Sequence, residues 1–156
     1  MIIRRANNND IHLINKLLYQ VLRVHHKGRP DIFKSNTKKY DDEQLKEIIK
    51  DDNRPIFVAV NDDDVVVGYA FCIFEQHINN NVLTDIKSLY IDDLCVDENV
   101  RGMHIGKRLY EYVLDFAKKS GCYNVTLNVW SCNESAYKFY LKMGLTPQKI
   151  NMEKIL

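Results

Sequence analysis

The sequence has no apolar run long enough to cross a bilayer, and Met1 to Arg5 lack the apolar core of a secretory signal peptide. Its formal net charge is only +1, which gives no general electrostatic reason to bind nucleic acid or a membrane surface. Internal repeats and low-complexity linkers are also missing. These absences predict a single domain over residues 1–156 that works in the cytoplasm and has no nucleic acid or membrane as partner.

Paired cysteines are missing too, because the four cysteines are scattered at positions 72, 95, 122 and 132. No Cys-x-x-Cys pair and no metal-ligand spacing occurs, so we expect a reducing compartment and no metal. His25 and His26 do not change this expectation, since helical neighbours point apart and no third ligand stands at a suitable spacing. The pattern Gly-x-x-x-x-Gly-Lys-Ser/Thr is absent, which argues against a P-loop nucleotide-binding protein.

The residues that are present suit a globular fold, with 46% hydrophobic and 28% charged residues. The periodicity predicts a helix between the Asn7–Asp10 turn and a break at Gly28–Pro30, and then helices over Asp41 to Lys50, Gly106 to Ser120 and Ser135 to Met143. Strands are predicted over Met1 to Ala6, Ile56 to Val60, Val65 to Phe74, Ile86 to Val96, Asn124 to Trp130 and Gln148 to Ile155. This order of elements predicts a mixed α/β sheet.

A basic loop with two glycines follows the predicted strand over Ile86 to Val96 and has the sequence VRGMHIGKRL over residues 100–109. A helix that begins here directs unpaired N–H groups and partial positive charge at an anion. Arg101, Lys107 and Arg108 add formal charge at the same point. The loop therefore predicts a site for a cofactor diphosphate, although a tight turn with a solvated basic rim would explain the same residues.

A second motif, NESAYKFYLKMGL over residues 133–145, strengthens the first. Together the two segments resemble the GNAT superfamily of acetyl-CoA-dependent N-acetyltransferases. The first is similar to that family's Arg/Gln-x-x-Gly-x-Gly/Ala loop, and the second to its Asn-x-x-Ala-x-x-Phe-Tyr-x-x-x-Gly helix. The resemblance runs from about residue 55 onward. It implies a mixed, splayed central sheet flanked by about four helices, with acetyl-CoA between the central strand and the strand near Val129.

The resemblance also implies which residues hold the cofactor. The backbone of Leu94, Cys95 and Val96 would pair with the pantetheine arm like an added strand. The pyrophosphate would lie on the loop formed by Arg101, Gly102, Met103, His104, Ile105, Gly106 and Lys107. Asn133 would contact the cofactor arm, although it also suits a helix N-cap.

His104 departs from the family pattern, which usually has glycine at this position. A left-handed torsion at His104 would cost roughly 1 kcal/mol. Its imidazole could instead donate a hydrogen bond to a phosphate oxygen.

Two residues are predicted to be catalytic. Tyr140 lies where the family has its general acid, and a phenol suits protonation of a thiolate, although simple helix packing is the alternative. Asp92 and Asp93 are expected on opposite faces of their strand, with Asp92 on the face of Tyr90, Leu94 and Val96. The segment resembles Tyr-Leu-Glu-Asp-Phe-Phe-Val of the spermidine/spermine and thialysine acetyltransferases, whose first acid is a base candidate. Asp92 would therefore relay a proton or attract a cationic amine, unless it is only a solvent-facing acid.

The expected reaction is direct acetyl transfer from acetyl-CoA to a primary amine of a small cationic acceptor. The stretch from His25 to Phe33 falls in the region that forms the family's acceptor wall. A protein N-terminus or lysine is the alternative acceptor, although Asn128 stands where N-terminal acetylating relatives have a glutamate base. A non-catalytic CoA-binding regulatory module is the other alternative. A homodimer through the predicted final strand is a further expectation.

Overall fold

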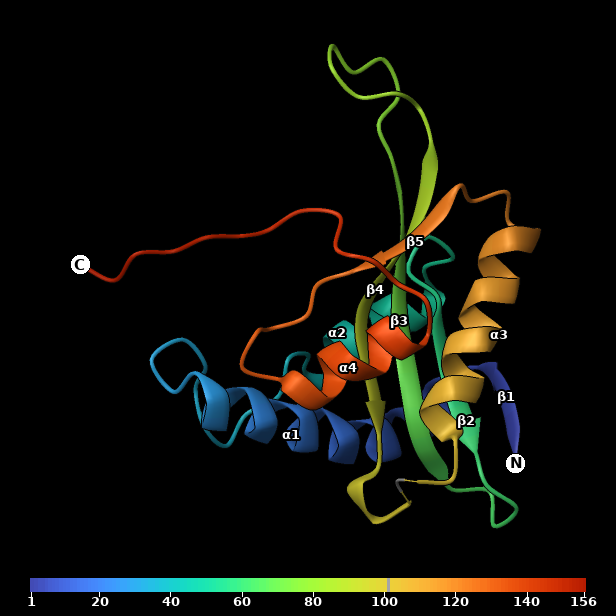
Figure 1. The fold of residues 1–156 in the computed structure, drawn as a ribbon. Helices are drawn as coiled ribbons and strands as arrows, with labels where there is room; N and C mark the ends of the chain where they lie inside the picture. Colours follow the sequence, from blue (N-terminus) through green and yellow to red (C-terminus); the bar gives the residue numbers. More distant parts are fainter. Residues whose placement is uncertain (101) are drawn as a thin grey trace.

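A five-stranded mixed sheet in the order β1-β2-β3-β4-β5 forms the centre of the protein (Figure 1). The computed structural model describes residues 1–100 and 102–156. Strands β1 (Ile2–Arg5), β2 (Ile56–Val60), β3 (Val66–Gln76) and β4 (Lys87–Val96) pair antiparallel in sequence. Strand β5 (Asn124–Leu127) pairs parallel with β4, which requires a crossover through a helix.

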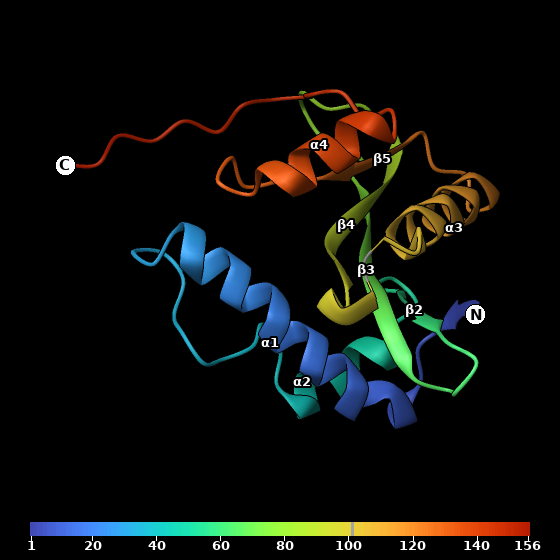
Figure 2. The ribbon, with the colours of Figure 1, turned by 60° about the horizontal axis from the view of Figure 1, so that its bottom comes forward.

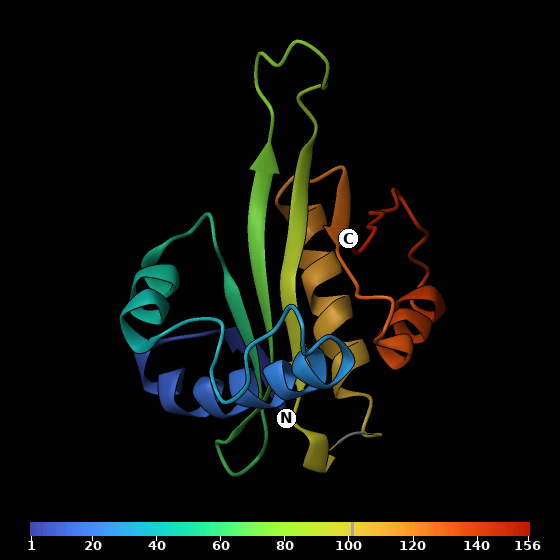
Figure 3. The same cartoon turned by 90° about the vertical axis from the view of Figure 1, so that its left-hand side faces the viewer.

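Helices cover both faces of this sheet (Figures 2 and 3). Helices α1 (Ile11–Gly28) and α2 (Asp42–Lys50) lie on one face. The crossover helix α3 (Ile105–Lys119) lies on the other, and α4 (Glu134–Lys142) follows β5. The predicted mixed α/β fold with its splayed sheet and four flanking helices is confirmed. None of the helices in the described ranges has both the length and the hydropathy that a membrane crossing requires.

Local signals in the sequence define where these helices begin and end. The Asn7 side chain accepts from the Asn9 backbone while Asp10 caps the Asn7 backbone in return, which forms the first turn before α1. Asp41 and Gln44 form the same reciprocal box at α2. Gly121 follows α3 with φ +74°, a left-handed torsion that glycine adopts without strain.

The sheet separates two apolar clusters. One lies under α1 and α2 and contains Leu17, Leu18, Tyr69, Phe71 and Cys95. The other lies under α3 and contains residues from β2, β3, β4 and α3, namely Phe57, Ala59, Val67, Ala70, Cys72, Leu89, Ile91, Ile105, Leu109, Tyr110, Val113 and Ala117. Each central strand thus contributes alternate residues to both clusters, which fixes the strand register.

Strand β5 is shorter than predicted, because it ends at Leu127 and not at Trp130. Its pairing with β4 covers only Ser88 to Ile91, opposite Asn124 to Leu127. Beyond this point β4 continues to Val96 beside β3 alone. The two parallel strands therefore separate, and the C-terminal half of β4 has no strand on its second side within the described residues.

The prediction of a final strand over Gln148 to Ile155 is wrong. Residues 146–156 form no strand, are exposed throughout and run away from the sheet as an extended arm (Figure 1). Alternating apolar residues such as Ile150 and Met152 favour a strand, but a strand also needs a neighbour to pair with. The arm contacts its own chain through an ion pair between Glu153 and Arg29. The homodimer expected through this segment stays a prediction.

The core under α3 gives a first test of the packing. Leu109 is fully buried between α3 and the sheet. We expect Leu109→Ala to lower the free energy of unfolding by about 2–5 kcal/mol, because it removes apolar contacts and leaves a cavity. Urea denaturation measures the loss. Val24→Ala, at a 40% exposed position on α1, is the control and should change stability by about 0.5 kcal/mol or less. Equal losses for both variants would contradict the described packing.

Candidate active site

A β-bulge in β4 organises the acidic residues of the site. Phe71 of β3 pairs with Asp93, but its neighbour Cys72 pairs with Ile91, so Asp92 is an extra residue on β4. The bulge interrupts the alternation of side chains, and Asp92 and Asp93 both reach groups on the α1/α2 face. The expectation that they lie on opposite faces is therefore wrong. Asp92 shares its face with Tyr90 as predicted, whereas Leu94 and Val96 pack toward the α3 cluster.

Asp92 is held by the segment that precedes α2. The Tyr40 hydroxyl donates to its Oδ2 atom at 2.6 Å. The Lys39 ammonium lies 2.9 Å from its Oδ1 atom. Desolvation, followed by the hydrogen bond to Asp92, raises the pKa of the Tyr40 phenol above its usual value. Asp92 is thus an ion-paired acid at the rim of the site, and not simply a solvent-facing strand residue.

Asp93 lies deeper and carries a perturbed proton affinity. The Tyr69 hydroxyl donates to its Oδ2 atom at 2.8 Å. Desolvation of the carboxyl raises the pKa of Asp93 to about 6, opposed by the Tyr69 hydrogen bond and by the Lys39 charge. A carboxyl with this pKa exchanges a proton close to neutral pH, which is typical of catalytic acids and bases.

The backbone of β4 after the bulge has an open edge. Asp97 donates its backbone N–H to the Val67 carbonyl at 2.9 Å. In an antiparallel ladder the alternate residue Cys95 then also directs its backbone groups to β3, while Leu94 and Val96 direct theirs away from it. Of the three residues predicted to pair with pantetheine, Leu94 and Val96 have the required direction. The Cys95 side chain is buried against α1, where its sulfur contacts the Leu17 carbonyl at 3.7 Å.

The predicted phosphate loop leads directly into α3. Gly102 has φ +88°, and His104 has φ +58°, so the residue that replaces the family's glycine does adopt the left-handed torsion. His104 is exposed and its side chain forms no capping hydrogen bond. Met103 is 67% exposed, and Lys107 lies 3.7 Å from Glu111. The predicted role of Arg101 falls outside the described residues.

Three elements meet where this loop joins α3. A Cβ atom on Gly106 would lie 3.6 Å from the ring of Phe139 on α4 and 3.6 Å from the Val96 side chain at the end of β4. The start of α3 is thereby adjacent to the open edge of β4. The end of the predicted phosphate loop and the end of the predicted pantetheine edge are therefore neighbours, and their cofactor contacts stay predictions.

Tyr140 follows Phe139 on α4, and their rings pack edge to face with centroids 5.3 Å apart. Its side chain is half-buried. Desolvation, followed by the charge of Asp93, raises the pKa of the Tyr140 phenol above its usual value, so the phenol stays protonated through the neutral range. Tyr140 and Asp93 are thus close enough to interact electrostatically, a pairing that the sequence analysis did not identify.

Asn133 serves as the N-cap of α4. Its Oδ1 atom accepts from the Ala136 backbone at 3.4 Å and from the Ser135 hydroxyl at 3.3 Å. This geometry matches the structural alternative considered for Asn133. Its contact with a cofactor stays a prediction.

An aromatic cluster joins the end of α1 to the segment after β5. The His25 ring stacks on Phe33 at 4.9 Å, and Phe33 meets Trp130 edge to face at 5.0 Å. A Cβ atom on Gly28 would lie 2.6 Å from the Cys132 sulfur, so the two segments are in tight contact. The stretch from His25 to Phe33, called here the His25–Phe33 wall, therefore packs against the segment after β5, and its role as the acceptor wall stays a prediction.

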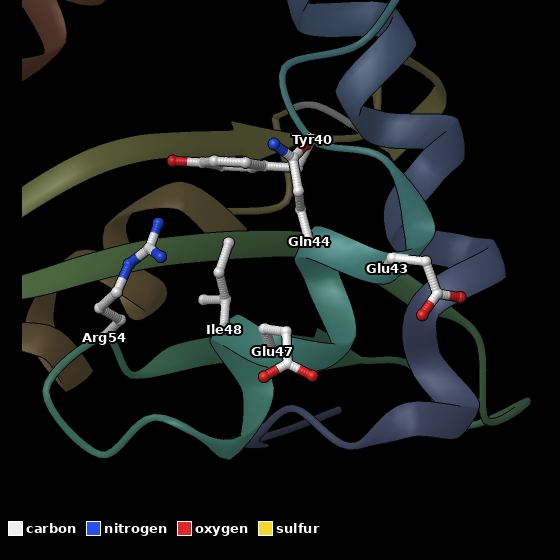
Figure 4. Close-up of a pocket in the computed structure, with 6 residues that line it drawn as sticks. All are labelled: Tyr40, Glu43, Gln44, Glu47, Ile48 and Arg54. Atoms are coloured by element: carbon white, nitrogen blue, oxygen red, sulfur yellow. The ribbon is translucent and has the colours of Figure 1, made fainter.

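A pocket of about 320 Å³ lies beside α2. Its lining residues come from α2 and its flanks, namely Tyr40, Glu43, Gln44, Glu47, Ile48 and Arg54 (Figure 4). The Arg54 guanidinium lies 5.9 Å from the Tyr40 ring centre. The lining contains none of the predicted cofactor residues, and Tyr40 links the pocket to Asp92. No group of three or more metal-ligating side chains occurs in residues 1–100 and 102–156.

Comparison with known proteins identifies the family. The sequence model of the acetyltransferase (GNAT) family matches residues 19–145. The chain therefore belongs to this family, and the resemblance found in the sequence is confirmed. Membership supports the class of enzyme that the sequence predicts, an acetyl-CoA-dependent acyltransferase.

The names of individual relatives state different activities. Glucosamine 6-phosphate N-acetyltransferase of Arabidopsis thaliana is 37% identical over 68 residues, which are 44% of each chain. Peptidyl-lysine N-acetyltransferase YjaB of Salmonella typhimurium is 34% identical over 103 residues, 65% of this chain and 58% of that protein. The matches thus span about half the length of these relatives. The crystal structure of a mutant BH1408 protein from Bacillus halodurans is 31% identical, covers 100% of this chain and 99% of its own, and has a TM-score of 0.96.

The Asp93 carboxyl gives a pH-dependent test of the site. Its pKa rises from an ordinary 3.8 to about 6 on folding, so the folded protein binds this proton more tightly than the unfolded chain. The resulting stability is complete below about pH 4 and is lost as the pH rises through about 6. Relative to Asp93→Asn, the native protein should therefore gain stability, on the order of 2 kcal/mol, between about pH 7 and pH 4.

Chemical denaturation of both proteins across this pH range measures the effect. Tyr69→Phe is the companion variant, because it removes the hydrogen bond that lowers the Asp93 pKa. In this variant the loss of stability should move to higher pH. A difference between the native protein and Asp93→Asn that does not change with pH would contradict the perturbed carboxyl.

Proposed function

We propose that this protein is an acetyl-CoA-dependent N-acetyltransferase that transfers the acetyl group directly to the primary amine of a small cationic acceptor. The observation that carries the proposal is the bulge in β4. It brings the carboxylates of Asp92 and Asp93 to one face, beside the open backbone edge of Leu94 and Val96. An ammonium-binding surface thus adjoins the surface that suits a thioester cofactor.

In this proposal, different residues bind different parts of acetyl-CoA. The backbone of Leu94 and Val96 binds the pantetheine amides as a neighbouring strand would, and one of these N–H groups faces the thioester carbonyl and stabilises its developing negative charge. The start of α3 and the loop from Gly102 to Lys107 bind the pyrophosphate through backbone N–H groups and the Lys107 charge. Asn133 contacts the cofactor arm near the start of α4.

The acidic pair prepares the acceptor. Asp92 attracts the ammonium group of the substrate, since its carboxylate already binds a cation, that of Lys39. Asp93, with a pKa of about 6, takes the proton that the ammonium must lose before the amine can attack. This assigns to Asp93 the base role that the sequence analysis gave to Asp92. Tyr140 donates its proton to the departing thiolate, as predicted.

A protein lysine is the second candidate acceptor. It is favoured by the similarity to a peptidyl-lysine N-acetyltransferase over 65% of the chain. Asn128 argues against the mechanism of N-terminal acetylating relatives, because its amide cannot take a proton and instead donates to the Tyr90 hydroxyl at 3.1 Å. A non-catalytic CoA-binding module would retain the loop and the open edge but would not need Tyr140.

Thiol release from acetyl-CoA, measured with polyamines, amino acids, aminoglycosides and lysine peptides, tests these alternatives. The proposal expects turnover with one class of cationic amine. Turnover with lysine peptides alone would favour the second candidate. Tight acetyl-CoA binding by calorimetry without any turnover would favour the module, and absence of binding would contradict the cofactor surface.

Tyr140→Phe tests the chemistry directly. The variant retains the ring that packs beside Phe139 but has no proton to donate. We expect kcat to fall by about 10²-fold or more while the dissociation constant of acetyl-CoA stays unchanged. Tyr137→Phe, at an exposed position one turn earlier on the same helix, is the matched control and should retain full activity. Equal activity of the two variants would exclude Tyr140 as the general acid.

A further inference from the structure

An ammonium group of the protein itself already lies at the acidic pair. Lys39 belongs to the segment between α1 and α2, and its Nζ atom is 2.9 Å from Asp92 Oδ1. The same Nζ atom lies 3.4 Å from the backbone carbonyl oxygen of Asp92. Its charge also opposes the desolvation that raises the pKa of both Asp93 and Tyr90, so it acts on several groups of the site. Lys39 therefore has the position that the proposed function assigns to an acceptor amine.

The neighbouring lysine has a different environment. The Lys38 ammonium lies 2.7 Å from Asp42 at the start of α2 and also donates to Asn15 on α1. Neither of these two partners belongs to β4, which contains the bulge and the proposed cofactor edge. The contact between Lys39 and Asp92 is thus specific to one of two adjacent lysines.

The open edge of β4 is within reach of the Lys39 side chain. Asp92, whose carbonyl contacts Nζ, precedes Leu94 by two residues, so across the bulge the rise is at most the value of about 6.6 Å for a regular strand. The Lys39 side chain is 42% exposed, and lysine has a flexible four-carbon stem. A change of rotamer can move Nζ over a distance of this size.

We infer that Lys39 is an intramolecular acetyl acceptor, so that the protein acetylates its own Lys39 when only acetyl-CoA is present. The inference rests on the proposed function. The Lys39 ammonium gives one proton to Asp93, which passes it to solvent. The neutral nitrogen then attacks the thioester carbon, so that a C–N bond forms and the C–S bond breaks. Tyr140 protonates the thiolate and regains a proton from the nitrogen. The products are Nε-acetyllysine, CoA thiol and one proton.

Acetylation has a direct electrostatic consequence at the site. An acetylated lysine has lost its positive charge and cannot form an ion pair. Asp92 then has neither the ammonium contact at its carboxylate nor the one at its backbone carbonyl. The position becomes available to the ammonium of an external acceptor.

The test uses the full chain with acetyl-CoA alone and follows acetylation of each lysine by peptide mass spectrometry. Lys39 should be acetylated at least about tenfold faster than Lys38, since a tethered amine has a high effective concentration. The first-order rate should not depend on protein concentration. Tyr140→Phe should slow the modification of Lys39 by about 10²-fold but leave any chemical acetylation of Lys38 unchanged.

Two charge-conserving variants provide the controls. Lys39→Arg retains the ion pair with Asp92 but should abolish the fast phase, whereas Lys38→Arg should leave it intact. Equal rates at Lys38 and Lys39, a rate unaffected by Tyr140→Phe, or a rate proportional to protein concentration would each overturn the inference. Turnover of external amines without acetylation of Lys39 would overturn this inference alone. Absence of both reactions would overturn the proposed function as well.

Discussion

The β-bulge at Asp92 is the constraint on which the rest of the site depends. Without the extra residue, Asp93 would face the predominantly apolar α3 cluster, where an ionised carboxyl would be costly to bury. With it, Asp93 meets the Tyr69 hydroxyl, and Asp92 meets Tyr40 and Lys39. The same shift returns Cys95 to the α1 side and aligns Leu94 and Val96 with the apolar core under α3. The bulge thus gives both carboxylates polar partners and keeps apolar side chains of β4 in both clusters.

The short pairing of β5 is the second feature that makes the site. A parallel strand that followed β4 to Val96 would occupy the backbone groups of Leu94 and Val96. Because pairing stops at Ile91 and Leu127, no strand in the described residues pairs with those groups, while β3 supports the strand from its other side. Where β4 and β5 separate, Phe139 packs near Gly106, and Phe33 packs against Trp130. Packed side chains therefore lie on both flanks of the separating strands, an arrangement that favours precise binding of a ligand.

The sequence predicts the elements whose signals are local. The turn at Asn7–Asp10 and the apolar periodicity of the helices each specify structure within a few residues. The helices over Asp42–Lys50, Ile105–Lys119 and Glu134–Lys142 lie within one residue of their predicted bounds. The left-handed torsion considered for His104 is also found.

Features that depend on distant partners were not predicted. The bulge depends on how β3 and β4 register, so simple alternation gave the wrong face for Asp93. The contacts of Asp92 come from residues more than fifty positions earlier, in a segment that carried no motif. The prediction of a final strand was wrong for the same reason. The alternation that includes Ile150 and Met152 does not indicate whether another strand lies close enough to pair with it.

The close approach of Gly28 to Cys132 has a consequence for the chemistry used to study this protein. Cys132 is the exposed one of the four thiols, and its sulfur occupies the space that a side chain on Gly28 would need. A group attached to that sulfur by an alkylating or disulfide reagent adds volume directly beside the end of α1, where the Gly28 side has no free space. The His25–Phe33 stretch begins at the same end of α1. Reagents that detect free thiols therefore react at a packed contact of this protein, and Cys132→Ser is the background that removes this reaction.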